Sequence, residues 1–151
     1  MKRQKTLIVG LGAAVAILAI TFARPSGFVT ASPSQFEALT AALAPHGMVL
    51  TGLALGQTME TAVPGPVGGS RAMEVAVATY GKVAQPIVYE GRLTMPDQDP
   101  PIQSVPVYAI QLGGLNLAPF GGPASEANLH RELVVFVDAA SGRVLVAITV
   151  R

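Results

Sequence analysis

The stretch VVFVDAASGRVLVAITV, residues 134–150, decides the fold, because a short polar interruption separates two apolar, β-branched runs. Runs of this composition are typical of strands, so the stretch predicts a β-hairpin. Asp138 opens the interruption, and its carboxylate is expected to accept hydrogen bonds from amides just ahead of it. Ser141 follows in the turn, and Gly142 supplies the positive φ that closes it. All three residues are predicted to be structural, and Asp138 is not expected to be catalytic.

Two helices are predicted upstream of this hairpin. The first lies in SPSQFEALTAALAPHG, where Ser32 caps the start and Gln35 completes a capping box. Pro45 and Gly47 end it. The second begins at a Ser70 cap and ends at Gly81, with an apolar stripe at helical spacing between them.

The remaining apolar runs predict strands separated by glycine- and proline-rich loops. They are MVLTGLAL (48–55, weakened by Gly52), PIVYEGRL (86–93), VPVYAIQL (105–112) and NLHRELVVFV (128–137), before the last strand at 143–150. Connections this short require antiparallel pairing. The sequence therefore predicts an α+β fold, with two helices in one layer packed on an antiparallel sheet of about four strands.

The N-terminus predicts an additional membrane helix. Three cations in MKRQK precede an uncharged apolar run at 6–23. Its length favours an uncleaved transmembrane anchor, while small residues near its end allow a cleaved signal peptide. Either alternative places the rest of the chain outside the cytoplasm, as a linker at 24–31 and an extracytoplasmic domain at 32–151.

Composition narrows the classes of partner. Charged residues make up 13% of the chain. The part after residue 23 contains seven basic and nine acidic residues, so its formal charge is −2. A nucleic-acid partner therefore lacks its usual electrostatic support. The chain has no cysteine, so the domain must be stable without disulfides.

Two segments together resemble PepSY-type domains, over roughly residues 70–151. VVFVDAASGRVL is similar to that family's terminal hairpin, and SRAMEVAVATYG is similar to its helix. The hairpin matches are Val137, Asp138, Ala139, Gly142, Val144 and Leu145; the helix matches are Ala72, Met73, Ala76, Tyr80 and Gly81. The resemblance implies a small extracytoplasmic module, found with peptidases or membrane proteins, that inhibits or regulates. It supplies no catalytic residues.

No catalytic, cofactor or metal site is predicted. The chain lacks the motifs of serine hydrolases, zinc peptidases and phosphate-binding loops. Its two histidines, His46 and His130, do not make a zinc site without cysteine. Asp97 and Asp99 provide too few oxygens for calcium, so they are expected to lie in a solvated loop.

The candidate partner contact is apolar. Leu115, Leu117 and Phe120 lie in a predicted glycine-rich connection at 113–127, and long loops in compact domains are commonly functional. An exposed apolar patch there would bind a protein partner. In the alternative, these side chains fold back over the open face of the sheet.

The function predicted from sequence is that of a non-catalytic binding or regulatory module. Its protein partner is unknown, with a peptidase or a membrane protein as the candidates, and residues 6–23 are expected to contact the membrane. The alternatives are a structural accessory subunit of a membrane assembly and, more weakly, an unrecognised hydrolase.

Overall fold

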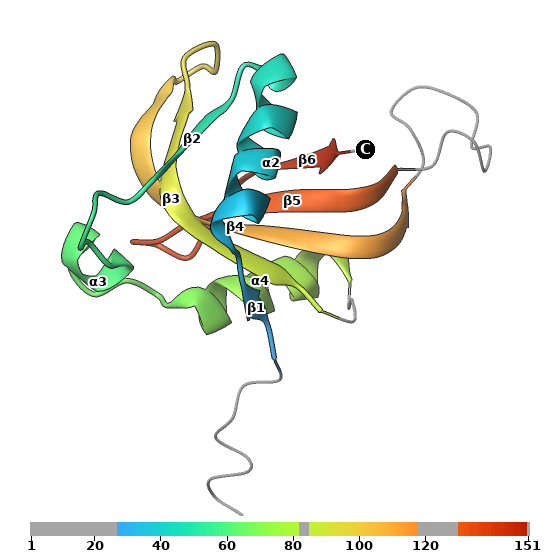
Figure 1. The fold of residues 1–151 in the computed structure, drawn as a ribbon, viewed down its shortest axis with the longest axis horizontal. Helices are drawn as coiled ribbons and strands as arrows, with labels where there is room; N and C mark the ends of the chain where they lie inside the picture. The colour runs from blue at the N-terminus through green and yellow to red at the C-terminus, as the bar shows by residue number, and fades with distance from the viewer. Residues whose placement is uncertain (1–26, 82–84, 118–129, 151) are drawn as a thin grey trace, which may run out of the picture.

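The computed structural model describes residues 27–81, 85–117 and 130–150 (Figure 1). Its strands are β1 (Val29–Thr30), β2 (Val49–Gly52), β3 (Ile87–Met95), β4 (Ile102–Leu117), β5 (His130–Asp138) and β6 (Val144–Val150). Its helices are α2 (Pro33–Leu43), α3 (Met59–Ala62) and α4 (Gly69–Tyr80), and a 3₁₀ turn at Ala44–His46 follows α2.

All six strands form one sheet. Its order is β1, β3, β4, β5, β6, and β2 pairs with β3 beside β1. Four of the pairings are antiparallel, whereas β1 runs parallel to the start of β3, with Val29 opposite Ile87. The crossover that makes this parallel pair possible contains α2, β2, α3 and α4.

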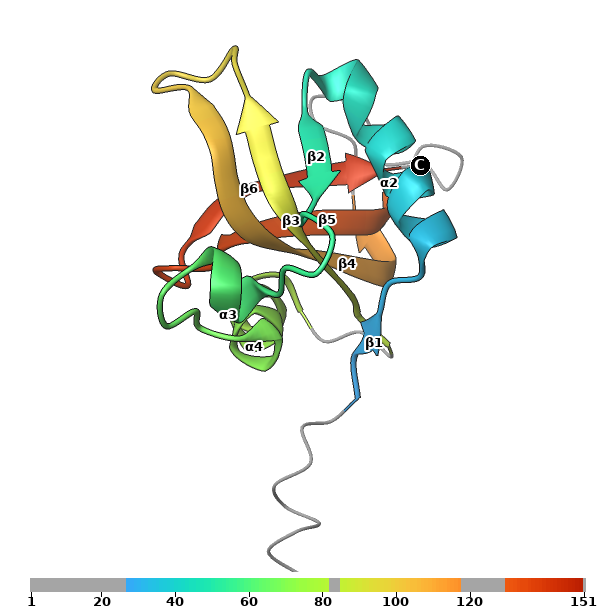
Figure 2. The same ribbon diagram turned by 60° about the vertical axis from the view of Figure 1, so that its left-hand side comes forward.

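Helices cover both faces of the sheet (Figures 1 and 2). Leu39 and Leu43 of α2 share one apolar cluster with Val134 and Phe136 of β5. The other cluster joins α3 and α4 to the alternate sheet residues. The run Leu133–Val137 is buried along its whole length because successive side chains point to opposite, covered faces.

The predicted start of α2 and the predicted ends of both long helices at their C-termini are confirmed. Ser32 Oγ accepts from the Gln35 amide over 3.3 Å, and Gln35 Oε1 accepts from the Ser32 amide over 2.8 Å, which completes the capping box of α2. Gly47 follows the 3₁₀ turn with φ of 67°, and Gly81 follows α4 with φ of 114°. The cap of α4 is Gly68, however, so the predicted Ser70 cap is wrong.

The predicted architecture itself is wrong. The fold is mostly sheet, with six strands instead of about four, and the three short helices in the described residues form two layers instead of one. β1 lies in the predicted linker and α3 in a predicted loop, and each is too short to show a periodicity in the sequence. β4 also extends to Leu117, five residues beyond its predicted end at residue 112.

The predicted membrane helix has no counterpart among the described residues. No helix in the described ranges is both long enough and apolar enough to span a membrane. The segment 6–23, on which the anchor and signal-peptide alternatives depended, lies outside the described residues.

Candidate functional site

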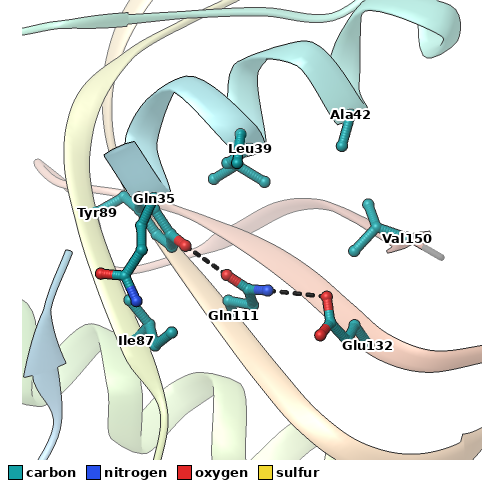
Figure 3. Close-up of a pocket in the computed structure, with 9 residues that line it drawn as sticks. Gln35, Leu39, Ala42, Ile87, Tyr89, Gln111, Glu132 and Val150 are labelled. Carbon is teal, nitrogen blue, oxygen red and sulfur yellow. Dashed lines mark hydrogen bonds between the residues drawn. The ribbon is translucent and has the colours of Figure 1, made fainter. Parts of the chain in front are cut away.

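A groove of about 240 Å³ lies between α2 and the sheet (Figure 3). Residues from α2, β3, β4, β5 and the end of β6 line it: Gln35, Ala38, Leu39, Ala42, Ile87, Tyr89, Gln111, Glu132 and Val150. Most of these side chains are apolar. The volume is below the roughly 300–1,000 Å³ of drug-sized ligand pockets, so the groove suits a single side chain or a small molecular fragment.

The helix leaves this space because the residues with which it lines the groove include two small alanines. Ala38 and Ala42 are four residues apart and therefore lie on the same side of α2. Leu39 and Leu43 are buried and hold the helix against the sheet. The leucines thus fix the position of α2, and the alanines form the wall of the groove on the helix side.

Three polar side chains form a hydrogen-bonded row along the sheet side of the groove (Figure 3). The Tyr89 hydroxyl donates to Oε1 of Gln111. The Gln111 amide nitrogen donates to Oε2 of Glu132 over 2.9 Å. The three residues come from the neighbouring strands β3, β4 and β5, so pairing across the sheet brings them together.

The row has a direction, because each donor points toward Glu132. Tyr89 is buried, and Gln111 and Glu132 are half-buried. Burial, and then the charge of Glu132, raise the pKa of Tyr89, so its hydroxyl stays a neutral donor. Within the described residues, Oε1 of Glu132 accepts no hydrogen bond and Glu132 forms no ion pair. As far as the described part of the chain goes, one carboxylate oxygen of Glu132 is therefore open to a ligand.

This arrangement is suited to binding a cation. Glu132 is the only ionisable carboxylate among the described residues lining the groove. Its oxygen can accept a hydrogen bond from an ammonium or guanidinium group, and such charge-assisted bonds are stronger than neutral ones. The described residues contain no cluster of three side chains able to hold a metal ion.

The sequence-predicted contact residues lie elsewhere. Leu115 and Leu117 belong to the last part of β4 and are half-buried against the cluster under α4. Phe120 lies outside the described residues, as does the rest of the predicted 113–127 connection beyond Leu117. The structure therefore places the two leucines on a strand, on the opposite face of the sheet from the groove.

Asp138, Ser141 and Gly142 lie in the turn between β5 and β6. Oδ1 of Asp138 accepts from the Ala140 amide over 2.9 Å, and Oδ2 accepts from the Ser141 hydroxyl over 2.8 Å. Gly142 has φ of 71°, and its amide donates to the Asp138 carbonyl over 2.8 Å. Both carboxylate oxygens of Asp138 are thus engaged within the turn.

Sequence reasoning missed the groove. Gln111 is the only polar amide in the otherwise apolar strand VPVYAIQL, which is a signal that its side chain requires a partner. Glu132 similarly precedes the apolar run LVVFV. The register that brings these two residues together is not visible in the sequence.

No protein-family model, curated protein or solved structure matches this chain.

Proposed function

We propose that this protein is a non-catalytic binding module that receives a basic side chain of a protein partner in the groove under α2. The observation that carries the proposal is the half-buried Glu132, which Gln111 holds at 2.9 Å while its second carboxylate oxygen has no partner in the described residues. Gln111 holds the acid in position, and among the described residues no cation pairs with it.

The apolar lining supports an arginine or lysine side chain in particular. Both residues have a long aliphatic stem that packs on apolar surface while the charged group reaches a polar atom. Leu39, Ala42 and Val150 supply such surface along the groove. An anionic group is disfavoured at the same place, because it would be repelled by Glu132.

Arginine is favoured over lysine. The row from Tyr89 to Glu132 lies along one side of the groove, and a planar guanidinium offers several donors to a carboxylate held in this way. The wider role as a peptidase regulator has support only from the resemblance of residues 70–151 to PepSY-type domains.

The proposal is tested with N-acetyl-arginine amide as the probe, titrated into the full chain and followed by calorimetry. Glu132→Gln keeps the size of the side chain and removes its charge, and we expect it to weaken binding about tenfold or more. The matched control is Glu90→Gln, which removes an acid from an exposed position on β3 outside the groove lining.

The two variants give separate outcomes. Weakened binding in Glu132→Gln with unchanged binding in Glu90→Gln supports the proposal. Equal weakening in both variants would mean that general electrostatic attraction holds the probe, and absence of binding to the unmodified chain would also overturn the proposal.

A further inference from the structure

Gln35 contributes a second polar group to the groove under α2. It lies in the first turn of the helix, and its side chain lines the groove together with Ile87 and Tyr89 of β3. Oε1 of Gln35 accepts from the Ser32 amide over 2.8 Å, as the capping box requires. The oxygen of this side-chain amide is therefore already committed to the start of the helix.

The capping bond also decides which atom of the amide is left over. A backbone N–H can donate only to the oxygen of a glutamine side chain, so the nitrogen Nε2 is the other, outer atom. Figure 3 shows this nitrogen directed toward Ile87. Among the described residues Nε2 of Gln35 has no acceptor, and the side chain is half-buried. The helix thus presents a hydrogen-bond donor to the groove.

This donor and the carboxylate of Glu132 lie at different ends of the groove. Ile87 pairs with Gln111 of β4, and Gln111 donates to Glu132 of β5. β3 and β5 are therefore two strand spacings apart, or about 10 Å across the sheet. In Figure 3 Gln35 lies next to Ile87, whereas Glu132 lies toward Val150. A ligand that contacts both polar groups must be extended, with an acceptor at one end and a cation at the other.

We infer that Gln35 is a specificity-determining residue of the groove, which donates to the backbone carbonyl of the same arginine residue whose guanidinium group binds Glu132. The inference rests on the proposed function and specifies its ligand. An arginine residue in a peptide has a carbonyl acceptor and a guanidinium donor at opposite ends of an aliphatic stem. The ligand is then an extended arginine residue of a polypeptide, instead of any small guanidinium compound.

The lining between the two polar groups suits this ligand. Apart from Glu132, the described residues that line the groove carry no charge, and Leu39 offers apolar surface to the aliphatic stem. The amide of Gln35 and the carbonyl of the ligand would both lose water on binding. A hydrogen bond between them replaces the lost water, so it favours a ligand that has the carbonyl.

The test compares the binding of two probes to the full chain by calorimetry. N-acetyl-arginine amide has the guanidinium group and a backbone carbonyl, whereas n-butylguanidine has the guanidinium group on an aliphatic stem without a carbonyl. Both probes carry one positive charge. We expect N-acetyl-arginine amide to bind the unmodified chain about fivefold more tightly than n-butylguanidine.

Gln35→Glu tests the donor itself. Glutamate keeps the oxygen that accepts from the Ser32 amide, so the capping box is retained, but its carboxylate has no N–H to donate. The ratio of the two affinities should therefore fall to about one. Because both probes have the same charge, this ratio cancels the general attraction of the added carboxylate. Ser34→Glu is the matched control, since it adds the same charge at an exposed position in the same turn, outside the groove lining.

The outcomes separate the inference from the proposed function. A preference for N-acetyl-arginine amide that disappears in Gln35→Glu and persists in Ser34→Glu supports the inference. Equal binding of the two probes to the unmodified chain overturns it, as does a preference that Gln35→Glu leaves unchanged or that Ser34→Glu also abolishes. If the proposed function itself were wrong, neither probe would bind, or both would bind Glu132→Gln as tightly as the unmodified chain.

Discussion

Gln111 joins Glu132 to Tyr89, because its side-chain amide donates to the carboxylate over 2.9 Å while its carbonyl accepts from the tyrosine hydroxyl. Both the oxygen and the nitrogen of the Gln111 side-chain amide are thus hydrogen-bonded. Replacing it leaves a buried hydroxyl and a half-buried carboxylate without this partner. Such unpaired groups are costly inside a protein.

Gln111→Leu should lower the free energy of unfolding by about 1–3 kcal/mol for this reason. Urea denaturation measures the change. The control is Gln103→Leu, the same substitution at an exposed position on the same strand, which should stay within about 0.5 kcal/mol. Equal effects of the two substitutions would show that the row contributes nothing to stability.

Gly91 of β3 should not tolerate a side chain. A Cβ atom added there would lie 2.6 Å from the carbonyl oxygen of Thr51 on β2. Gly91→Ala therefore forces β2 away from β3, and we expect a loss of about 1–3 kcal/mol in unfolding free energy. Gly113→Ala on β4 meets no atom within 4 Å and should change little. If Gly91→Ala and Gly113→Ala were equally stable, β2 could not lie as close to Gly91 of β3 as described here.

Tyr108 should make the free energy of unfolding depend on pH in the alkaline range. Burial, and then the charges of Glu90 and Glu60, raise its pKa to about 12, against an ordinary value of 10.0. The folded state therefore retains the proton while the unfolded state releases it. The contribution of the protonated Tyr108 hydroxyl to the free energy of unfolding is fully present below pH 10 and is lost as pH rises from 10 to 12.

The unfolding free energy should accordingly fall with pH more steeply in the unmodified protein than in Tyr108→Phe. The difference in slope should reach at most about 1.4 kcal/mol per pH unit. Urea denaturation at several pH values between 9 and 11 measures it. Parallel pH profiles would contradict the assigned burial of this hydroxyl.

Asp138 should act on stability alone. Asp138→Ala removes the acceptors of the Ala140 amide and the Ser141 hydroxyl, and we expect it to cost about 1–3 kcal/mol. Asp97→Ala, in an exposed loop, is the control and should be nearly neutral. Loss of a hydrolytic activity in Asp138→Asn, with the turn intact, would contradict this structural role.

The sequence was most informative where a feature is local. The capping box of Ser32 and Gln35 lies within four residues, and the turn at Asp138 within five, so pattern and structure agree. β1 has only two residues, and no periodicity can reveal it. The second helical layer was missed because the unbroken apolar run at 133–137 was not interpreted as a strand covered on both faces.

The groove depends on relationships between distant segments. Gln35, Gln111 and Glu132 come from α2, β4 and β5, and only the sheet register and the crossing of α2 bring them to one place. The clash at Gly91 likewise depends on the approach of β2. A lone glycine or glutamine in a strand indicates a special environment but does not identify its partner.

The most direct test of the central claim compares two probes on the unmodified full chain. N-acetyl-arginine amide and N-acetyl-citrulline amide have nearly the same shape, but only the first carries a positive charge. Nuclear magnetic resonance titration, read at the side-chain amide of Gln111, reports binding beside Glu132. The account predicts that the arginine probe shifts this signal and binds about tenfold or more tightly than the citrulline probe. Equal affinities, or a Gln111 signal that neither probe moves, would contradict it.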